Sequence, residues 1–198
     1  MTLLGLTGGV GMGKSVCARL LESRGIPVVD TDDLARRVVE PGQPALAEVA
    51  RVFGREILDE EGRLRRNLIG QRVFSDPRAR KQLEAILHPR IRELWRARAS
   101  QWRKEGRPLG AVAIPLLFET GAEQELDMVI CLACSARTQF SRLEARGWTA
   151  EHIRQRIEAQ LPIDQKIARS DRVVWTEMPI EIHELQLLKI VRKLRVAS

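Results

Sequence analysis

Short apolar runs alternate along the chain with segments of helical periodicity. After the first run, apolar residues at Val16, Leu20 and Leu21 predict a helix that ends at Gly25. The first thirty residues therefore have the strand, helix, strand order of a parallel sheet, whose strands are apolar on both faces. Five runs in all predict strands: residues 3–7, 26–29, 111–114, 128–132 and 172–175.

The segments between the strands are mostly helical. The pattern from residue 34 to about residue 102 is interrupted by glycine and proline turns, of which His88-Pro89 is the last. A charged helical pair is expected at residues 138–146 and 149–160, and a closing helix at 180–194. This order of elements predicts an α/β fold with a doubly wound, mostly parallel sheet of five strands.

We expect one domain with two excursions from its sheet. The predicted core comprises residues 1–33, 106–135 and 166–198, and residues 34–105 form a helical insertion. Residues 136–165 form a basic helical lid. Ligands of such sheets bind at the carboxyl ends of the strands, so both excursions are expected over that edge.

Composition limits the cellular setting and the partners. No stretch approaches about 20 apolar residues and no signal peptide is recognisable, so we predict a cytoplasmic protein without a membrane partner. The three cysteines, Cys17, Cys131 and Cys134, are too few for a disulfide framework. Since the C-x-x-C pair lies in a predicted strand, its side chains point to opposite faces and are expected in the core.

Charge favours anionic ligands without choosing among them. The 33 lysines and arginines exceed the 26 acidic residues by 7. Aromatic residues make up 4% of the chain and tyrosine is absent, which weakens the case for nucleic-acid binding by base stacking. A small anionic molecule is therefore the expected partner, and the sequence is compatible with a monomer.

A glycine-rich loop gives the strongest chemical signal. Residues 8–15, GGVGMGKS, fit the pattern G-x-x-x-x-G-K-[ST] between a predicted strand and a predicted helix. In such a loop successive N–H groups surround phosphate oxygens, Lys14 reaches the β- and γ-phosphates, and the Ser15 hydroxyl holds Mg²⁺. The fold is therefore expected to be that of P-loop NTPases, similar to nucleoside monophosphate kinases.

The nucleotide is expected to be ATP. Recognition of guanine by P-loop proteins uses an N-K-x-D segment, but Asn67 is the only asparagine and is followed by leucine. The residues expected to contact the nucleotide are Gly9, Gly11, Met12, Gly13, Lys14, Ser15, Val16 and Arg146.

An acidic pair follows the second predicted strand. Asp30 and Asp32 are expected at the same sheet edge as the phosphate loop. One carboxylate could organise Mg²⁺ through water, and the other could accept the proton of an acceptor hydroxyl. The alternative is that either aspartate caps the helix that begins near Asp33.

Three polar residues share one face of the predicted lid helix. Gln139, Arg142 and Arg146 have i, i+3, i+7 spacing, and a lid arginine can stabilise charge on a transferring phosphoryl group. The alternative is a solvated helix face with ordinary ion pairs.

Several blocks together resemble the dephospho-coenzyme A kinase family over nearly the whole chain. They are the phosphate loop, Asp30-Thr31-Asp32, VVEPG at 38–42, Leu87-His88-Pro89, PLLFE at 115–119, and Gln139 with Arg142. The resemblance implies MgATP-dependent phosphorylation of the ribose 3′-hydroxyl of dephospho-coenzyme A, the last step of coenzyme A synthesis. Other small-metabolite or nucleoside monophosphate kinases, and a non-catalytic ATP-binding module, remain as alternatives.

The resemblance also implies roles for individual residues. Asp32 matches the catalytic base, Lys14 and Ser15 match phosphate and Mg²⁺ ligands, and Arg142 matches the lid arginine. The insertion at 34–105 resembles the acceptor-binding region. The implied acceptor-binding residues are Asp30, Arg66, His88, Arg90 and Glu119.

Two segments depart from the family pattern. Ser170-Asp171 stands where Ala-Asp is usual, and residues 175–178, WTEM, replace a segment that in relatives tends to contain Asn and Gly. Because the second segment is expected to border the adenine, the base contacts there stay open.

Overall fold

The computed structural model describes residues 1–196, which form two compact units. The first unit consists of Met1–Asp30 together with the chain from Ala99 onward. The second unit is Thr31–Arg98.

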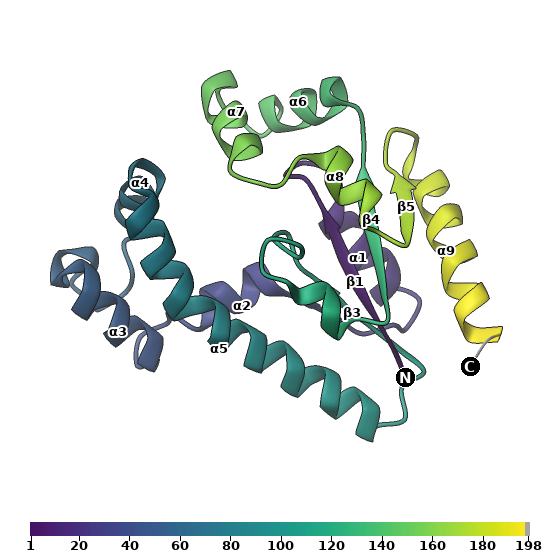
Figure 1. Ribbon diagram of the computed structural model, residues 1–198, viewed down its shortest axis with the longest axis horizontal. Helices are drawn as coiled ribbons and strands as arrows, with labels where there is room; N and C mark the ends of the chain where they lie inside the picture. Colours follow the sequence, from purple (N-terminus) through teal and green to yellow (C-terminus); the bar gives the residue numbers. More distant parts are fainter. Residues whose placement is uncertain (197–198) are drawn as a thin grey trace. The chain divides into compact units, whose positions relative to one another are not determined.

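A five-stranded sheet is the centre of the first unit (Figure 1). All of its pairings are parallel and the strand order is β2-β3-β1-β4-β5, which confirms the predicted α/β class. The central strand β1 is buried at six of its seven positions, as expected for a strand covered on both faces. The strands are β1 (Thr2–Gly8), β2 (Val28–Asp30), β3 (Leu109–Ala113), β4 (Met128–Ala133) and β5 (Arg172–Trp175).

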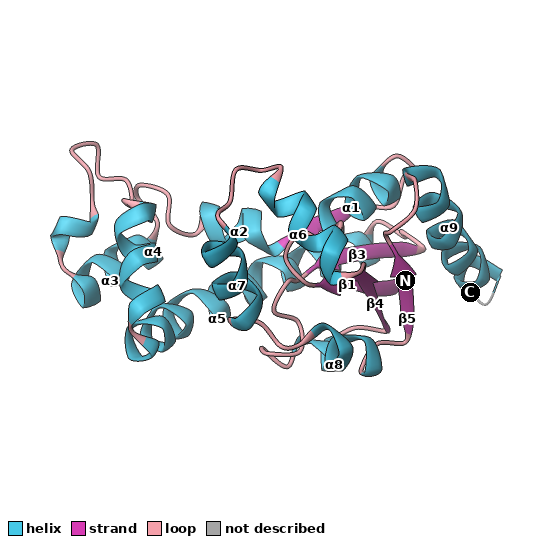
Figure 2. Cartoon of the chain, turned by 90° about the horizontal axis from the view of Figure 1, so that it is seen from above, coloured by secondary structure: helices cyan, strands magenta, loops and turns pink. Residues whose placement is uncertain are grey.

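Helices cover both faces of this sheet. Figure 2 shows α1 and α8 on opposite sides of it. Helix α8 was not foreseen in the sequence, because its six residues are too short for a periodic pattern. The helices of the first unit are α1 (Lys14–Glu22), α6 (Ala136–Glu144), α7 (Ala150–Glu158), α8 (Ile163–Ala168) and α9 (Ile180–Val196), and a 3-10 turn η2 spans Ala122–Glu125.

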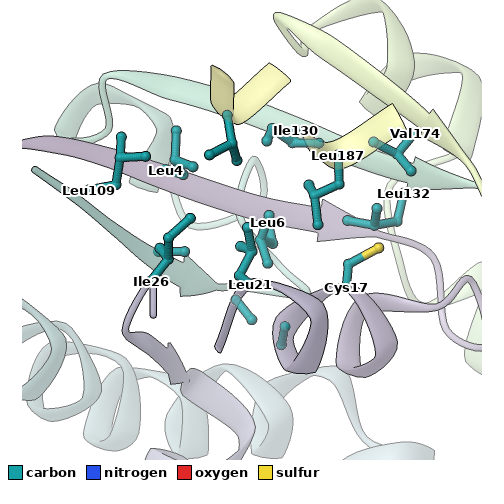
Figure 3. Close-up of a cluster of buried hydrophobic side chains, with 14 residues drawn as sticks. Leu4, Leu6, Cys17, Leu21, Ile26, Leu109, Ile130, Leu132, Val174 and Leu187 are labelled. Carbon is teal, nitrogen blue, oxygen red and sulfur yellow. The ribbon is translucent and has the colours of Figure 1, made fainter. Parts of the chain in front are cut away.

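The main core lies between the sheet and helices α1 and α9 (Figure 3). Leu4 and Leu6 of β1 point into it together with Leu21 of α1 and Leu187 of α9. Burying each such side chain contributes about 1.5–3 kcal/mol, so this layer anchors the start of α1 to the end of β1.

The two cysteines of the C-x-x-C pair are core residues, as predicted, and Cys17 is buried as well. All three carry free, buried thiols. Burial raises the pKa of Cys17 to about 12 and that of Cys131 to about 11, so both are protonated at neutral pH.

Among the described residues, no helix is long and apolar enough to cross a bilayer.

The second unit is helical, with a core of its own. Apolar residues of α3, α4 and α5 pack together, among them Val49, Phe53, Ile69 and Ile86. Its helices are α2 (Thr31–Arg37), α3 (Pro44–Phe53), α4 (Arg66–Ser75) and the part of α5 (Pro77–Lys104) up to Arg98, with a 3-10 turn η1 at Arg55–Ile57.

One predicted turn in this region is wrong. Helix α5 continues through Pro89 instead of stopping at His88. Proline lacks an N–H group and leaves the carbonyl four residues earlier without its helical donor. Next to this gap, the Arg90 guanidinium donates to the Ile86 carbonyl oxygen at 2.6 Å, which satisfies an acceptor in the same turn.

Candidate active site

The phosphate loop joins β1 to α1 and depends on left-handed glycines. Gly8, Gly11 and Gly13 have φ values of 137°, 76° and 88°. A Cβ on Gly8 would lie 2.2 Å from the main-chain oxygen of Leu132, so no side chain fits there. Gly13 precedes α1, and its carbonyl accepts the N–H groups of Val16 and Cys17, both at 3.1 Å. A loop of this kind at a helix N-terminus presents N–H groups to an anion.

Lys14 folds back over the loop. Its Nζ donates to the carbonyl oxygens of Gly8 at 2.7 Å and Gly9 at 2.9 Å. The adjacent Ser15 is exposed, with its hydroxyl in the first turn of α1. The loop therefore combines a cation, a hydroxyl and helix N–H groups, which is the donor set for a triphosphate with a bound metal.

Helix α6 packs on the outside of this loop. Gln139 is buried and its Nε2 donates to the Val10 carbonyl oxygen at 2.8 Å. Leu143 is buried against Gly11, where a Cβ would lie 3.0 Å from its Cγ. Of the three predicted lid residues, Arg146 lies beyond the end of α6 and is exposed.

Arg142 is anchored to the segment after β5. Its guanidinium donates to the Thr176 hydroxyl at 3.0 Å and to the Thr176 carbonyl oxygen. The same hydroxyl lies 3.3 Å from the carbonyl oxygen of Met12 in the phosphate loop. Since arginine has five N–H donors, these two contacts leave others that can reach an anion.

Glu177 belongs to the helix cap of α6. Its carboxylate accepts the Ser135 N–H at 2.7 Å and the Ser135 hydroxyl at 2.8 Å, and also the Thr138 hydroxyl. These hydrogen bonds, that of Thr138 first, lower the pKa of Glu177 to about 2. The WTEM segment is thus tied to the lid through Thr176 and Glu177, and no local pattern in the sequence reveals these two contacts.

Asp30 lies at the ligand-binding edge of the sheet. It is the last residue of β2 and pairs in register with Ala113, which pairs in turn with Leu6 of β1. The strand ends of β1, β2 and β3 therefore share one edge, as expected for ligand sites of parallel sheets.

Glu119 contacts a fully buried lysine. Its Oε1 lies 2.9 Å from Lys166 Nζ and accepts the Leu161 N–H at 2.8 Å. Lys166 also donates to the Pro115 carbonyl oxygen at 2.7 Å. A residue expected to bind the acceptor thus also connects the turn after β3 to α8.

The remaining candidates belong to the second unit. Asp32 is exposed in the first turn of α2, and Arg66 is exposed at the start of α4. Arg90 forms an ion pair with Glu48 at 2.6 Å. Burial lowers the pKa of His88 below its ordinary value, and the Glu84 carboxylate opposes this shift.

The parallel sheet, the glycine loop and the cationic groups around it define the class of protein, a P-loop kinase. More particularly, the chain belongs to the dephospho-CoA kinase family, whose sequence model matches residues 2–180. The resemblance read from the sequence blocks is therefore confirmed.

Individual relatives agree with this membership. A dephospho-CoA kinase from Anaeromyxobacter dehalogenans is 49% identical over 175 residues, which cover 88% of this chain and 83% of that protein. The crystal structure of TT1252 from Thermus thermophilus has a TM-score of 0.86 at 36% identity, and the match covers 97% of this chain and 96% of that one. Dephospho-CoA kinase from Campylobacter jejuni shares the fold, with a TM-score of 0.72, 24% identity and coverage of 97% and 96%.

Proposed function

We propose that the protein transfers the γ-phosphoryl group of ATP to the ribose 3′-hydroxyl of dephospho-coenzyme A, giving coenzyme A and ADP. The observation that carries this proposal is the phosphate loop with Lys14 at the end of β1, in a chain of the dephospho-CoA kinase family. This phosphorylation of the 3′-hydroxyl is the last step of coenzyme A synthesis.

The loop residues hold the triphosphate. N–H groups of Gly9 and of the segment Gly11–Val16 surround the phosphate oxygens. Lys14 neutralises charge on the β- and γ-phosphates. Support comes from the left-handed glycines, which allow such N–H groups to converge. Arg146 is proposed to reach the nucleotide from the exposed end of the lid.

Mg²⁺ fits the oxygen donors present near the loop. The Ser15 hydroxyl, and Asp30 through water, are ligands of the type that Mg²⁺ prefers. When bound, the ion supplies charge neutralisation between the β- and γ-phosphates.

Asp32 and Arg142 act on the reacting groups. Asp32 accepts the proton of the 3′-hydroxyl as that oxygen attacks the γ-phosphorus, and its exposed position in the first turn of α2 is compatible with this role. Arg142 stabilises charge on the transferring group through N–H donors that Thr176 does not use.

The acceptor is proposed to bind in the helical region 34–105. The other two parts of the proposed domain are the lid, residues 136–165, and the core, residues 1–33, 106–135 and 166–198. Arg66 is exposed and cationic, and Arg90 is held in one orientation by Glu48. His88 is neutral at physiological pH because its pKa is lowered, so it can offer both a donor and an acceptor. Asp30 and Glu119 complete the proposed acceptor contacts.

We also propose that the reaction takes place in the cytoplasm. A reducing compartment keeps Cys17, Cys131 and Cys134 as thiols, which is the form in which they fill the core.

The test is direct assay of the acceptor. The purified protein is mixed with MgATP and dephospho-coenzyme A, and coenzyme A is identified by mass spectrometry; a Lys14→Met variant serves as control. We expect coenzyme A in proportion to ADP, and a loss of at least about 100-fold in the control, as for removal of a charge-stabilising group. Product from AMP or another small alcohol, with none from dephospho-coenzyme A, would refute the acceptor.

A further inference from the structure

Two glutamines from opposite ends of the lid bind the same residue of the phosphate loop. Gln139, in α6, donates from Nε2 to the Val10 carbonyl oxygen at 2.8 Å. Gln160, two residues after the end of α7, accepts the Val10 N–H with Oε1 at 3.1 Å. Both main-chain polar groups of Val10 are therefore satisfied by side-chain amides.

The direction of both contacts follows from the main chain. A backbone N–H can only donate and a carbonyl can only accept, so Gln160 presents its oxygen and Gln139 its amino group. An apolar residue at either position would leave a polar group of Val10 without that partner. Gln139 is 5% exposed, so water cannot readily replace its amide.

Neighbouring contacts hold these glutamines in place. The N–H of Leu161, the residue after Gln160, is bound by Glu119 Oε1 at 2.8 Å. The Gln139 main-chain N–H donates to the Ser135 carbonyl at 2.9 Å in the first turn of α6. Each side chain therefore approaches Val10 from a backbone that is fixed independently of the loop.

We propose that Gln139 and Gln160 are positioning residues that clamp Val10 and thereby hold the phosphate loop in the conformation that binds a triphosphate. The inference rests on the proposed function only in that the loop binds ATP. Ordering a glycine-rich loop on binding costs conformational entropy, because glycine has more freedom to lose than other residues. A loop already held at its tip binds the nucleotide without that cost.

The clamp also links the lid to the nucleotide. Gln139 lies in the first turn of α6 and Gln160 follows α7, so the loop tip is joined to both ends of the α6–α7 hairpin. Neither glutamine contacts a reacting atom in this assignment, and their removal acts on the nucleotide through Val10.

The experiment compares Gln139→Met and Gln160→Met with Gln155→Met. Methionine has similar length without the amide, and the Gln155 side-chain amide donates to Glu151 on the same helix, at 3.2 Å. MgATP affinity is measured by titration calorimetry without acceptor, and KM is measured for each substrate. We expect each of the first two variants to bind MgATP about tenfold more weakly, in keeping with loss of one part-buried hydrogen bond. In these two variants the KM for dephospho-coenzyme A should change less than about twofold. In the control, Gln155→Met, MgATP affinity and both KM values should change less than about twofold.

Two further readouts separate positioning from general stability. Hydrogen exchange of the Val10 N–H should accelerate in Gln160→Met, whereas Gln160→Glu, which keeps an acceptor, should restore protection. Gln139→Glu places an acceptor against a carbonyl and should not rescue Gln139→Met. The double Met variant should lose less affinity than the product of the single losses, since both act on one residue.

The outcomes distinguish this inference from the proposed function. Unchanged MgATP affinity in both Met variants, or equal rises in both KM values, would refute the clamp. Equal recovery of MgATP affinity in Gln139→Glu and Gln160→Glu would refute the clamp as well. If a Met variant fails to fold, comparison of these two Glu variants gives the same test. A wild-type protein that binds MgATP but does not convert dephospho-coenzyme A refutes the acceptor and leaves the clamp testable.

Discussion

Lys166 Nζ lies 2.9 Å from Glu119 Oε1, and the lysine side chain has no exposed surface. A buried ammonium is costly to desolvate unless it is paired and hydrogen-bonded. Here one carboxylate and the Pro115 carbonyl oxygen, at 2.7 Å, supply those partners. The pair thus joins α8 to the turn that follows β3.

Replacing Lys166 should therefore destabilise the first unit. In Lys166→Met the carboxylate of Glu119 and the carbonyl of Pro115 lose their donor, and we expect the free energy of unfolding to fall by about 3 kcal/mol. Urea unfolding with an unchanged m-value measures this. Lys189→Met, at an exposed site of α9, is the control and should stay within about 0.5 kcal/mol of wild type. Similar stability of both variants would show that the buried pair contributes nothing net.

Two glycines should respond to alanine in opposite directions. A Cβ at Gly8 would lie 2.2 Å from the Leu132 carbonyl oxygen, and φ there is 137°. Gly8→Ala should therefore lower the free energy of unfolding by about 3 kcal/mol or more and weaken MgATP binding. Gly70, inside α4, has no atom within 4 Å of such a Cβ, so Gly70→Ala should stabilise by about 0.5–1 kcal/mol. Thermal unfolding of both variants tests the prediction, and a tolerated Gly8→Ala would contradict the loop geometry.

The sequence predicted what depends on local pattern. The apolar runs identified the five strands of the described sheet, and the signal is continuous in β1, β3 and β4, which are buried at nearly every position. The phosphate loop was found because its glycines occupy fixed spacings, and three of them have positive φ in the structure. Strand alternation predicts core positions for Cys131 and Cys134, and both are buried.

The rest could not be predicted because it depends on contacts between distant residues. Gln160 is 150 residues from Val10, and Glu177 is 42 residues from Ser135. Neither contact leaves a periodic trace in the sequence. Pro89 was read as a turn because proline disfavours helix interiors, but α5 continues through it with the side chain of Arg90 bonded to Ile86.

The cap of α6 should depend on pH through Glu177. Hydrogen bonds from Thr138 and Ser135 lower the pKa of this carboxyl from 4.5 to about 2 in the folded protein. A depressed folded pKa stabilises the fold above the unfolded pKa, and this contribution is lost as pH falls from about 4.5 towards 2. The unfolding temperature of Glu177→Gln should thus lie below that of wild type at pH 7, and the difference should shrink as the pH is lowered to 3.5.

A control for this experiment is Glu181→Gln, at an exposed position near the start of α9. Its first-turn carboxylate contributes about 0.3–1 kcal/mol through the helix dipole, so its difference from wild type should vary less with pH than that of Glu177→Gln. A difference between wild type and Glu177→Gln that stays constant with pH would argue against a role for the charge, and would leave only the geometry of the cap.

Asp32→Asn should separate proton transfer from nucleotide binding. If Asp32 accepts the proton of the acceptor hydroxyl, the asparagine amide of the variant cannot do so, and kcat should fall by about 10²- to 10⁴-fold. MgATP affinity, measured without acceptor, should change less than about twofold. The matched control is Asp33→Asn: both residues are exposed in the first turn of α2, where a carboxylate contributes about 0.3–1 kcal/mol through the helix dipole. Asp33 pairs with Arg36 at 3.0 Å, so Asp33→Asn shows how much activity is lost when a carboxylate of this turn and its contact are removed. A deficit found only in Asp32→Asn therefore reports the chemistry, whereas an active Asp32→Asn would show that another group, or none, accepts the proton.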